Sequence, residues 1–322
     1  MDIQAVYKLV ESDRQAVDSL IRERLYSEVA LVNQIGHYIV NSGGKRLRPI
    51  LVLLSAGAFN YTGGHRHELA AVIEFIHTAT LLHDDVVDGS ELRRGRDTAN
   101  AVWGNQASVL VGDFLYSRAF QMMVSVGSMR VMQILSDATN TIAEGEVKQL
   151  LNVHNAEVTE EVYLDVIHCK TAKLFEAASQ IGAVLANQPA EVETAMAAYG
   201  RHLGAAYQLV DDVLDYSSSS EELGKNIGDD LAEGKPTLPL IYVLQHGSEA
   251  QKALVRAAIE NGGKDQIAAI TAAIESTGAL AYTSRSAQRE ADLAVAALEI
   301  IPESPYKQAL ISLARFSVAR TF

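Results

Sequence analysis

Cysteine is almost missing from this sequence: Cys169 is the single one among 322 residues. One thiol cannot close an internal disulfide, and it has no second cysteine with which to bind a metal. A small side chain in the core is therefore the favoured role of Cys169. This cysteine usage suits a reducing compartment, so we expect a cytoplasmic protein.

Positive charge is scarce as well. The chain has 27 Lys and Arg against 40 Asp and Glu, which gives a net charge of −13. Such a balance argues against a nucleic-acid-binding surface. Any anionic ligand would have to be held by local clusters of Lys and Arg, or by metal ions.

Long apolar runs are also absent. No run reaches the roughly 18 residues that a membrane span requires, so we expect no transmembrane helix. Residues 1–20 include several acidic side chains and lack a basic segment followed by an apolar one. We therefore expect no signal peptide.

Proline is rare, with 6 in the chain and none between Pro49 and Pro189, so nothing in that stretch forces a helix to end. Apolar residues recur at helical spacing, and no series of strands is indicated. The sequence predicts an all-α protein, and in the absence of a long linker a single domain over residues 1–322. The main predicted helices cover residues 2–39, 49–59, 68–88, 108–126, 130–152, 159–185 and 191–216.

Two identical D-D-x-x-D patterns stand in these apolar helices, at residues 84–88 and 211–215. Asp84 and Asp88 share one helix face, as do Asp211 and Asp215, because residues four apart are neighbours on a helix. Like charges at this spacing destabilise a bare helix. A single solvated acidic patch would be the simpler explanation of one pattern, whereas two patterns favour a bound cation. Carboxylate oxygens are the ligands that Mg²⁺ prefers.

Cations cluster in two places in this acidic chain. Lys45, Arg46 and Arg48 lie at a predicted helix start, where backbone N–H groups also favour an anion. A second cluster, Arg93 and Arg94, follows the first aspartate pattern, and Arg suits bidentate contact with phosphate. Either cluster alone would equally fit an exposed, solubilising surface. Single candidates elsewhere are His77, Lys170, Thr171, Gln208, Lys225 and Lys235.

Together these residues resemble the trans-isoprenyl (polyprenyl) diphosphate synthase family, and the resemblance covers nearly the whole chain. Residues 89–100 are polar and basic and are predicted to form a loop. One departure from the family lies in this loop: Asp97 stands where many relatives have proline, which leaves the rigidity of the loop open. The segments that carry the resemblance are residues 43–49, 81–88 with 93–95, 112–113, 170–171, 207–215, 224–231 and 233–237.

The resemblance implies a homodimeric bundle of helices around a deep central cavity, with two or three Mg²⁺ ions in each active site. It assigns the metal to Asp84, Asp88, Asp211 and Asp215, with Asp85 and Asp212 in the catalytic set. An allylic diphosphate would be held by Arg93, Lys170, Thr171, Gln208 and Lys225, with Lys235 near it. Isopentenyl diphosphate would be held by Lys45, Arg48, His77 and Arg94.

Among its relatives the chain resembles the long-chain synthases, which would deliver their product to the membrane for the side chain of ubiquinone or menaquinone. Ala79 and Thr80, just before the first aspartate pattern, are small where short-chain relatives carry an aromatic side chain. Helix geometry puts Thr80 on the Asp84 face, whereas the case for Ala79 depends on the resemblance. Ordinary helix packing is the alternative for Ala79. Met123 is the candidate floor of the cavity.

Other interpretations remain. A class I terpene cyclase also ionises an allylic diphosphate, but it needs no second diphosphate site and usually has an aromatic pocket, whereas aromatics here are 6%. A silent subunit of a heteromeric synthase usually loses one aspartate motif, and this chain keeps both. A helical lipid-binding protein would not need two metal sites, and a synthase with a shorter or longer product is open too.

Overall fold

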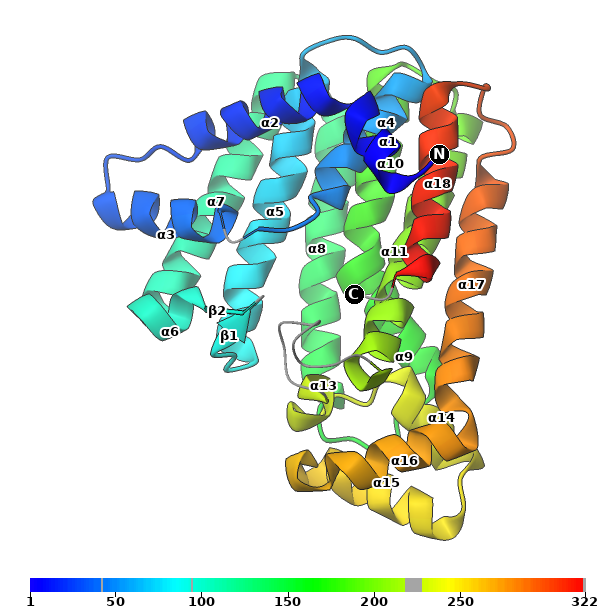
Figure 1. Ribbon diagram of the computed structural model, residues 1–322. Helices are drawn as coiled ribbons and strands as arrows, with labels where there is room; N and C mark the ends of the chain where they lie inside the picture. The colour runs from blue at the N-terminus through cyan, green and yellow to red at the C-terminus, as the bar shows by residue number, and fades with distance from the viewer. Residues whose placement is uncertain (42, 94, 218–227, 321–322) are drawn as a thin grey trace. The chain divides into compact units, whose positions relative to one another are not determined.

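The structure is a computed structural model that describes residues 1–41, 43–93, 95–217 and 228–320. These residues are almost entirely helical (Figure 1), which confirms the all-α prediction. In chain order the helices are α1 (Ile3–Leu9), α2 (Glu11–Arg24), α3 (Ala30–Val40), α4 (Leu47–Ala58), α5 (His65–Val87), α6 (Ala99–Trp103), α7 (Asn105–Val126), α8 (Met129–Asn152), α9 (Glu160–Ile167), the π-helical turn η1 (His168–Ala172), α10 (Lys173–Leu185), α11 (Ala190–Ser217), α13 (Asp229–Ala232), α14 (Leu238–His246), α15 (Glu249–Asn261), the 3-10 turn η2 (Lys264–Gln266), α16 (Ile267–Thr277), α17 (Ala279–Ala297) and α18 (Pro305–Ala319).

Residues that lie close in space form two compact units. Unit one consists of Met1–Thr139, Leu174–Gly200 and Ala297–Leu313. Unit two consists of Asn140–Lys173, Arg201–Ala296 and Ala314–Phe322. The prediction of a single domain remains a prediction.

The long helix predicted over residues 2–39 is wrong, because this segment forms α1, α2 and α3. Between α2 and α3 the Ser27 backbone N–H donates to Asn33 Oδ1 at 2.9 Å, and Asn33 Nδ2 donates back to the Ser27 carbonyl at 2.7 Å. These side-chain bonds compete with the helical backbone pattern, which is how Ser and Asn commonly end helices. Apolar spacing alone did not show this competition.

The core of unit one is built on α4, whose residues Pro49–Ala58 are all buried, and on α5, which packs against both α4 and α7. Gly112 lets α7 come close to α5, because a Cβ at that position would overlap the ring of His83. That close approach lies directly beside the first aspartate pattern. The backbone of Gly112 thus helps to place the end of α5.

In unit two the helix predicted over residues 159–185 is interrupted by η1. Here α8 passes so close that a Cβ on Gly145 would lie 2.8 Å from both the Cβ of Cys169 and the backbone N of Lys170. π-helical turns occur often at functional sites, where they change the direction of side chains. In the same unit, buried apolar side chains of α9, α11 and α14 pack together, including Ile167, Leu209 and Ile241.

The loop predicted over residues 89–100 contains a short antiparallel pair, β1 (Leu92–Arg93) and β2 (Arg96–Asp97). Gly95, at φ +72°, supplies a backbone conformation that few other residues tolerate. Asp97, the position that departs from the family pattern, pairs with Leu92, and its carbonyl accepts a hydrogen bond from the Tyr38 hydroxyl at 2.7 Å. Among the described residues, no helix is long and apolar enough to cross a membrane.

Candidate active site

The first aspartate pattern lies at the C-terminal end of α5. Asp84 and Asp85 are in its last turn, and Asp88 is the capping residue, whose N–H donates to the Asp84 carbonyl at 2.8 Å. A helix C-terminus carries partial negative charge, so carboxylates there are disfavoured. The position is consistent with the expectation from spacing that Asp84 and Asp88 bind a cation, and metal binding by them stays a prediction.

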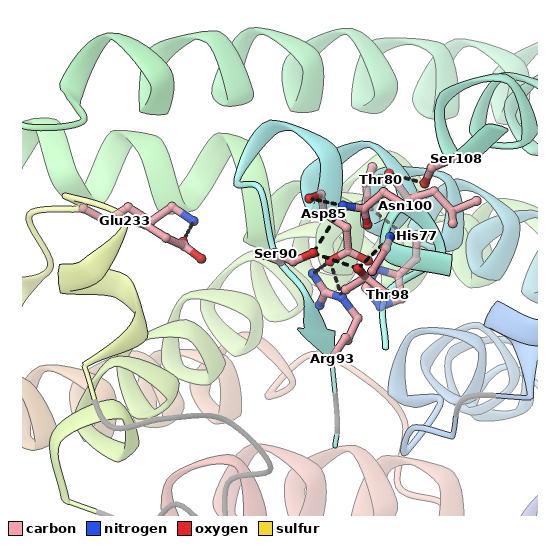
Figure 2. A network of polar contacts seen from close by, with 12 residues as sticks. His77, Thr80, Asp85, Ser90, Arg93, Thr98, Asn100, Ser108 and Glu233 are labelled. Carbon is pink, nitrogen blue, oxygen red and sulfur yellow. Dashed lines mark hydrogen bonds and ion pairs between the residues drawn. The ribbon is translucent and has the colours of Figure 1, made fainter. Parts of the chain in front are cut away.

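Asp85 is fully buried and faces Arg93 of β1 (Figure 2). Arg93 places Nε at 2.8 Å and Nη2 at 2.7 Å from the same carboxylate oxygen, Oδ1. The Asn100 side chain donates to the carbonyls of Asp85 and Ser90, each at 3.2 Å. These bonds tie the β1–β2 segment to the end of α5 and place the Arg93 guanidinium beside the aspartates. Arg94 lies outside the described residues.

The cluster at the start of α4 is held by an unusual backbone. Gly43 and Gly44 have φ of +85° and +133°, and Arg46, the residue that caps α4, has φ +47°. Its side chain pairs with Asp18 at 2.9 Å and so stabilises this turn rather than pointing to a ligand. Lys45 precedes the turn at a half-buried position.

Arg48 and His77 were predicted to serve one ligand, and the structure brings them together. Arg48 Nη1 lies 3.2 Å from His77 Nε2, and the guanidinium carbon is 4.3 Å above the centre of the Phe175 ring. Phe175 is fully buried in α10, so it offers a fixed face for a cation–π contact. Sequence patterns did not indicate Phe175, because nothing local distinguishes it from other core phenylalanines.

The chain-length candidates lie on two packed helices. Ala79 in α5 and Met123 in α7 are both fully buried. Thr80 is half-buried, and its hydroxyl donates to the His77 carbonyl at 2.7 Å. Burial fits a cavity wall and ordinary packing equally well, so the roles of these residues stay predictions.

The second aspartate pattern occupies the last two turns of α11, again at a helix C-terminus. Asp215 is buried, whereas the side chain of Asp211 is 44% exposed. Asp211 Oδ1 accepts a hydrogen bond at 2.9 Å from Arg320, which also lies 3.5 Å above the Tyr207 ring. Arg320 was not predicted. Its position near the chain end, 109 residues from Asp211, left no sequence signal that could connect the two.

Asp212 is buried within the protein and is held by neutral donors. The Tyr163 hydroxyl donates to its Oδ2, and Gln208 Nε2 donates to its Oδ1 at 2.9 Å. Burial and the nearby charge of Asp230 raise the pKa of Asp212 to about 8, although both hydrogen bonds act in the opposite direction. Burial also raises the pKa of Tyr163, which keeps its hydroxyl protonated.

Two lysines of unit two, Lys170 and Lys235, lie close to carboxylates of the same unit. Lys170 Nζ, projecting from η1, lies 2.6 Å from Glu146 Oε2 and 2.6 Å from Gln149 Oε1 of α8. Beside it, the Thr171 hydroxyl donates to Gln208 Oε1 at 3.0 Å. Lys235 pairs with Glu233 at 2.5 Å. Lys225 lies outside the described residues.

The carboxylates of the two aspartate patterns can be compared with the ligands that Mg²⁺ prefers. Within the described ranges, no three His, Cys, Asp or Glu side chains are arranged to hold a metal ion by themselves. Each aspartate pattern instead offers hard carboxylates in pairs. That set fits Mg²⁺, which is commonly bound by one or two carboxylates together with water and substrate phosphates.

Comparisons with known proteins bear on the family of the chain. A family model described as polyprenyl synthetase matches residues 29–277. The chain is 52% identical over 321 residues to octaprenyl diphosphate synthase of Escherichia coli K12, covering 99% of each chain, and 48% identical to a geranyl-diphosphate-specific all-trans-nonaprenyl-diphosphate synthase of Rhodobacter capsulatus, covering 98% of each. The crystal structure of a polyprenyl synthase from Caulobacter crescentus CB15, complexed with calcium and isoprenyl diphosphate, superposes with a TM-score of 0.96 at 43% identity, over 100% of this chain and 98% of the other.

Proposed function

The chain belongs to the polyprenyl synthetase family, and on that premise we propose that it makes octaprenyl diphosphate. As a long-chain trans-prenyltransferase it condenses isopentenyl diphosphate onto an allylic diphosphate such as farnesyl diphosphate. The observation that carries the proposal is the pair of aspartate patterns, each at the negative end of an apolar helix where a cation is needed. The 52% identity to the E. coli octaprenyl enzyme supports the eight-unit product.

Asp84, Asp88, Asp211 and Asp215 would hold two or three Mg²⁺ ions together with the diphosphate of the allylic substrate. When bound, these ions would offset the charge that develops on the departing diphosphate. The structural neighbour that contains calcium and isoprenyl diphosphate supports a divalent cation beside this ligand class.

Two sets of side chains would divide the substrates. Isopentenyl diphosphate would be held by Arg48 and His77, which are already in contact, together with Lys45 and Arg94. The allylic diphosphate would be held by Arg93, Lys170, Thr171, Gln208 and Lys225, with Lys235 near it. Among these side chains, the Arg93 guanidinium is held in place by Asp85.

The reaction follows from this division. Cations around the allylic diphosphate stabilise its departure, and the C–O bond breaks to leave an allylic carbocation. The alkene of isopentenyl diphosphate, held beside it, forms the new C–C bond, and a proton is lost. The released diphosphate is the proposed acceptor of that proton. Apolar walls would exclude water, which would otherwise capture the cation.

Farnesyl diphosphate, isopentenyl diphosphate and Mg²⁺ incubated with the pure protein test the proposal. We expect mass spectrometry of the dephosphorylated extract to show a polyprenol of eight isoprene units, with none formed in a matched reaction containing chelator. Cyclic hydrocarbons or unchanged substrates would overturn the proposal. A linear product of another length would correct only the chain length.

Ala79 and Met123 supply the test of how that length is set. Ala79→Tyr would place an aromatic ring in the path of the growing chain and should give products of about three or four units. Met123→Ala should lengthen them, because it removes a large side chain from the proposed floor. An unchanged distribution from folded, active Ala79→Tyr would remove Ala79 from the cavity wall.

We further propose that residues 1–322 act as one polyprenyl synthetase domain, since α8 and α11 each contribute to both compact units. A cytoplasmic homodimer that hands its product to the membrane is the proposed working form. Exposed apolar side chains of unit one, Leu110, Val124 and Met129, support binding of a second copy. Light scattering that gives the mass of one chain would contradict the dimer.

A further inference from the structure

Both carboxylate oxygens of Asp212 accept hydrogen bonds from side chains of the protein. Its side chain is 1% exposed. Gln208 Nε2 donates to Oδ1 at 2.9 Å, and the Tyr163 hydroxyl donates to Oδ2. Each oxygen of Asp212 already has a protein donor, and the residue is almost completely buried, which leaves little room for a hydrated cation. The geometry therefore favours a role other than metal binding.

The amide of Gln208 is held at both ends. Its Nε2 donates to Asp212, and its Oε1 accepts from the Thr171 hydroxyl at 3.0 Å. Ionised Asp212 only accepts hydrogen bonds, so a reversed amide would direct its carbonyl oxygen at another acceptor. The Thr171 hydroxyl can donate or accept and therefore pairs with either orientation. The contact with Asp212 thus selects the observed orientation. Nε2 retains one N–H for which the described part of the chain offers no hydrogen-bond acceptor.

These four side chains come from two segments. Tyr163 and Thr171 belong to the continuous stretch formed by α9 and η1, whereas Gln208 and Asp212 lie one turn apart on α11. Tyr163 is 6% exposed, and its hydroxyl has Asp212 as its partner. The Tyr163 hydroxyl fixes the Asp212 carboxylate, which in turn fixes the Gln208 amide. The amide oxygen accepts a hydrogen bond from the Thr171 hydroxyl.

We propose that Tyr163 and Asp212 are positioning residues that hold the Gln208 amide with its remaining N–H toward the allylic diphosphate. The inference rests on the proposed function, in which Gln208 binds that diphosphate. The consequence is chemical: an anion is attracted by the N–H and repelled by the carbonyl oxygen of the same amide. We call the hydrogen-bonded pair of Tyr163 and Asp212 the clamp. Without it, the amide would populate both orientations.

Tyr163→Phe tests the clamp because it removes one hydroxyl and preserves the ring. We expect the KM for farnesyl diphosphate to rise about tenfold, the usual size of one lost hydrogen bond, while the KM for isopentenyl diphosphate changes less than about twofold. Tyr199→Phe is the matched control. Tyr199 is fully buried, lies on α11 as Gln208 does, and donates to the Leu310 carbonyl at 2.8 Å. Its loss should lower stability and leave both KM values unchanged.

A double-mutant cycle separates positioning from general damage. In a Gln208→Ala background the clamp has no amide to orient, so adding Tyr163→Phe should leave the KM for farnesyl diphosphate unchanged within about twofold. Additive effects would overturn the proposal, as would a normal KM in the folded Tyr163→Phe enzyme. If Tyr163→Phe does not fold, Asp212→Asn takes its place in the cycle with the same expected non-additivity.

The reaction of the wild-type protein separates a failure of the proposed function from a failure of the clamp alone. A wild-type protein that fails to condense the two diphosphates would refute the proposed function and the clamp together. An active wild type with normal kinetics in both Tyr163→Phe and Asp212→Asn would refute the clamp alone.

Discussion

The two aspartate motifs have the same pattern and the same position at a helix C-terminus, but they are neutralised differently. In both, the second aspartate is buried: Asp85 fully, and Asp212 at 1% exposure. At α5 a cation, Arg93, pairs with that second aspartate. At α11 a cation, Arg320, pairs with the first aspartate, Asp211, and neutral donors hold Asp212.

The difference shows that a five-residue pattern does not determine the electrostatics of its members. Asp85 receives two contacts from Arg93 on Oδ1, and its buried Oδ2 has no hydrogen-bond partner among the described residues. Asp212 has one donor on each oxygen. We propose a common division of work: the second aspartate orients a side chain that holds diphosphate, and the first and last aspartates bind metal.

The largest effect should come from the first aspartate of either motif. Asp84→Ala and Asp211→Ala should each reduce turnover by several orders of magnitude while helix content stays normal, because the loss of one carboxylate disrupts a metal site. Circular dichroism and steady-state assays in Mg²⁺ check this. Near-normal turnover by a folded variant would show that its motif does not bind the metal.

The next effect separates the cations of the two units. Arg48→Ala should raise the KM mainly for isopentenyl diphosphate, and Lys170→Ala mainly for the allylic substrate. A charge-assisted contact contributes roughly 1.5–3 kcal/mol, so each KM should rise about ten- to a hundredfold. Initial rates measured against each substrate in turn decide the matter. Equal effects of both variants on both substrates would contradict the partition.

Removing the cation from each motif should have unequal consequences for stability. Arg93→Met leaves the buried carboxylate of Asp85 uncompensated and should lower the free energy of unfolding by about 3 kcal/mol. Arg320→Met leaves the half-exposed Asp211 to be solvated, so we expect about 1 kcal/mol. Urea denaturation in chelator measures both. A larger loss for Arg320→Met would reverse the comparison.

The smallest effect concerns pH. The raised pKa of Asp212 means that the folded, metal-free protein binds a proton between about pH 4 and pH 8 that the unfolded chain does not bind. Its contribution to stability is therefore present at low pH and is lost as the pH rises toward 8. Asp212→Asn should weaken this dependence in urea titrations with chelator. An identical pH dependence in wild type and variant would place the titration elsewhere.

Local patterns predicted much of this molecule. Helical spacing correctly placed α5, α7, α8 and α11, and the aspartate pairs within two of them. Arg48 and His77, which were predicted to hold the same ligand, lie in contact, and their binding role stays a prediction. The break between α2 and α3 was missed, since it depends on side-chain hydrogen bonds of Ser27 and Asn33 that compete with helix formation.

The features that could not be predicted depend on contacts between segments that are far apart in the sequence. Tyr163, Phe175 and Arg320 have no local pattern that marks them, and each acquires its role from a partner on another element. The π-helical turn at Lys170 is similar, because the close passage of Gly145 becomes visible only in three dimensions. The sequence therefore predicted candidate binding groups, and the structure shows which side chains contact and orient them.

Binding of Mn²⁺ in place of Mg²⁺ gives the most direct test of this division of work. Electron paramagnetic resonance with inorganic diphosphate present would count the Mn²⁺ ions bound by wild type, Asp211→Asn and Asp212→Asn. We predict that Asp212→Asn binds as many ions as wild type, whereas Asp211→Asn loses at least one. Equal loss in both variants would contradict the account, because Asp212 would then be a metal ligand rather than a residue that orients Gln208.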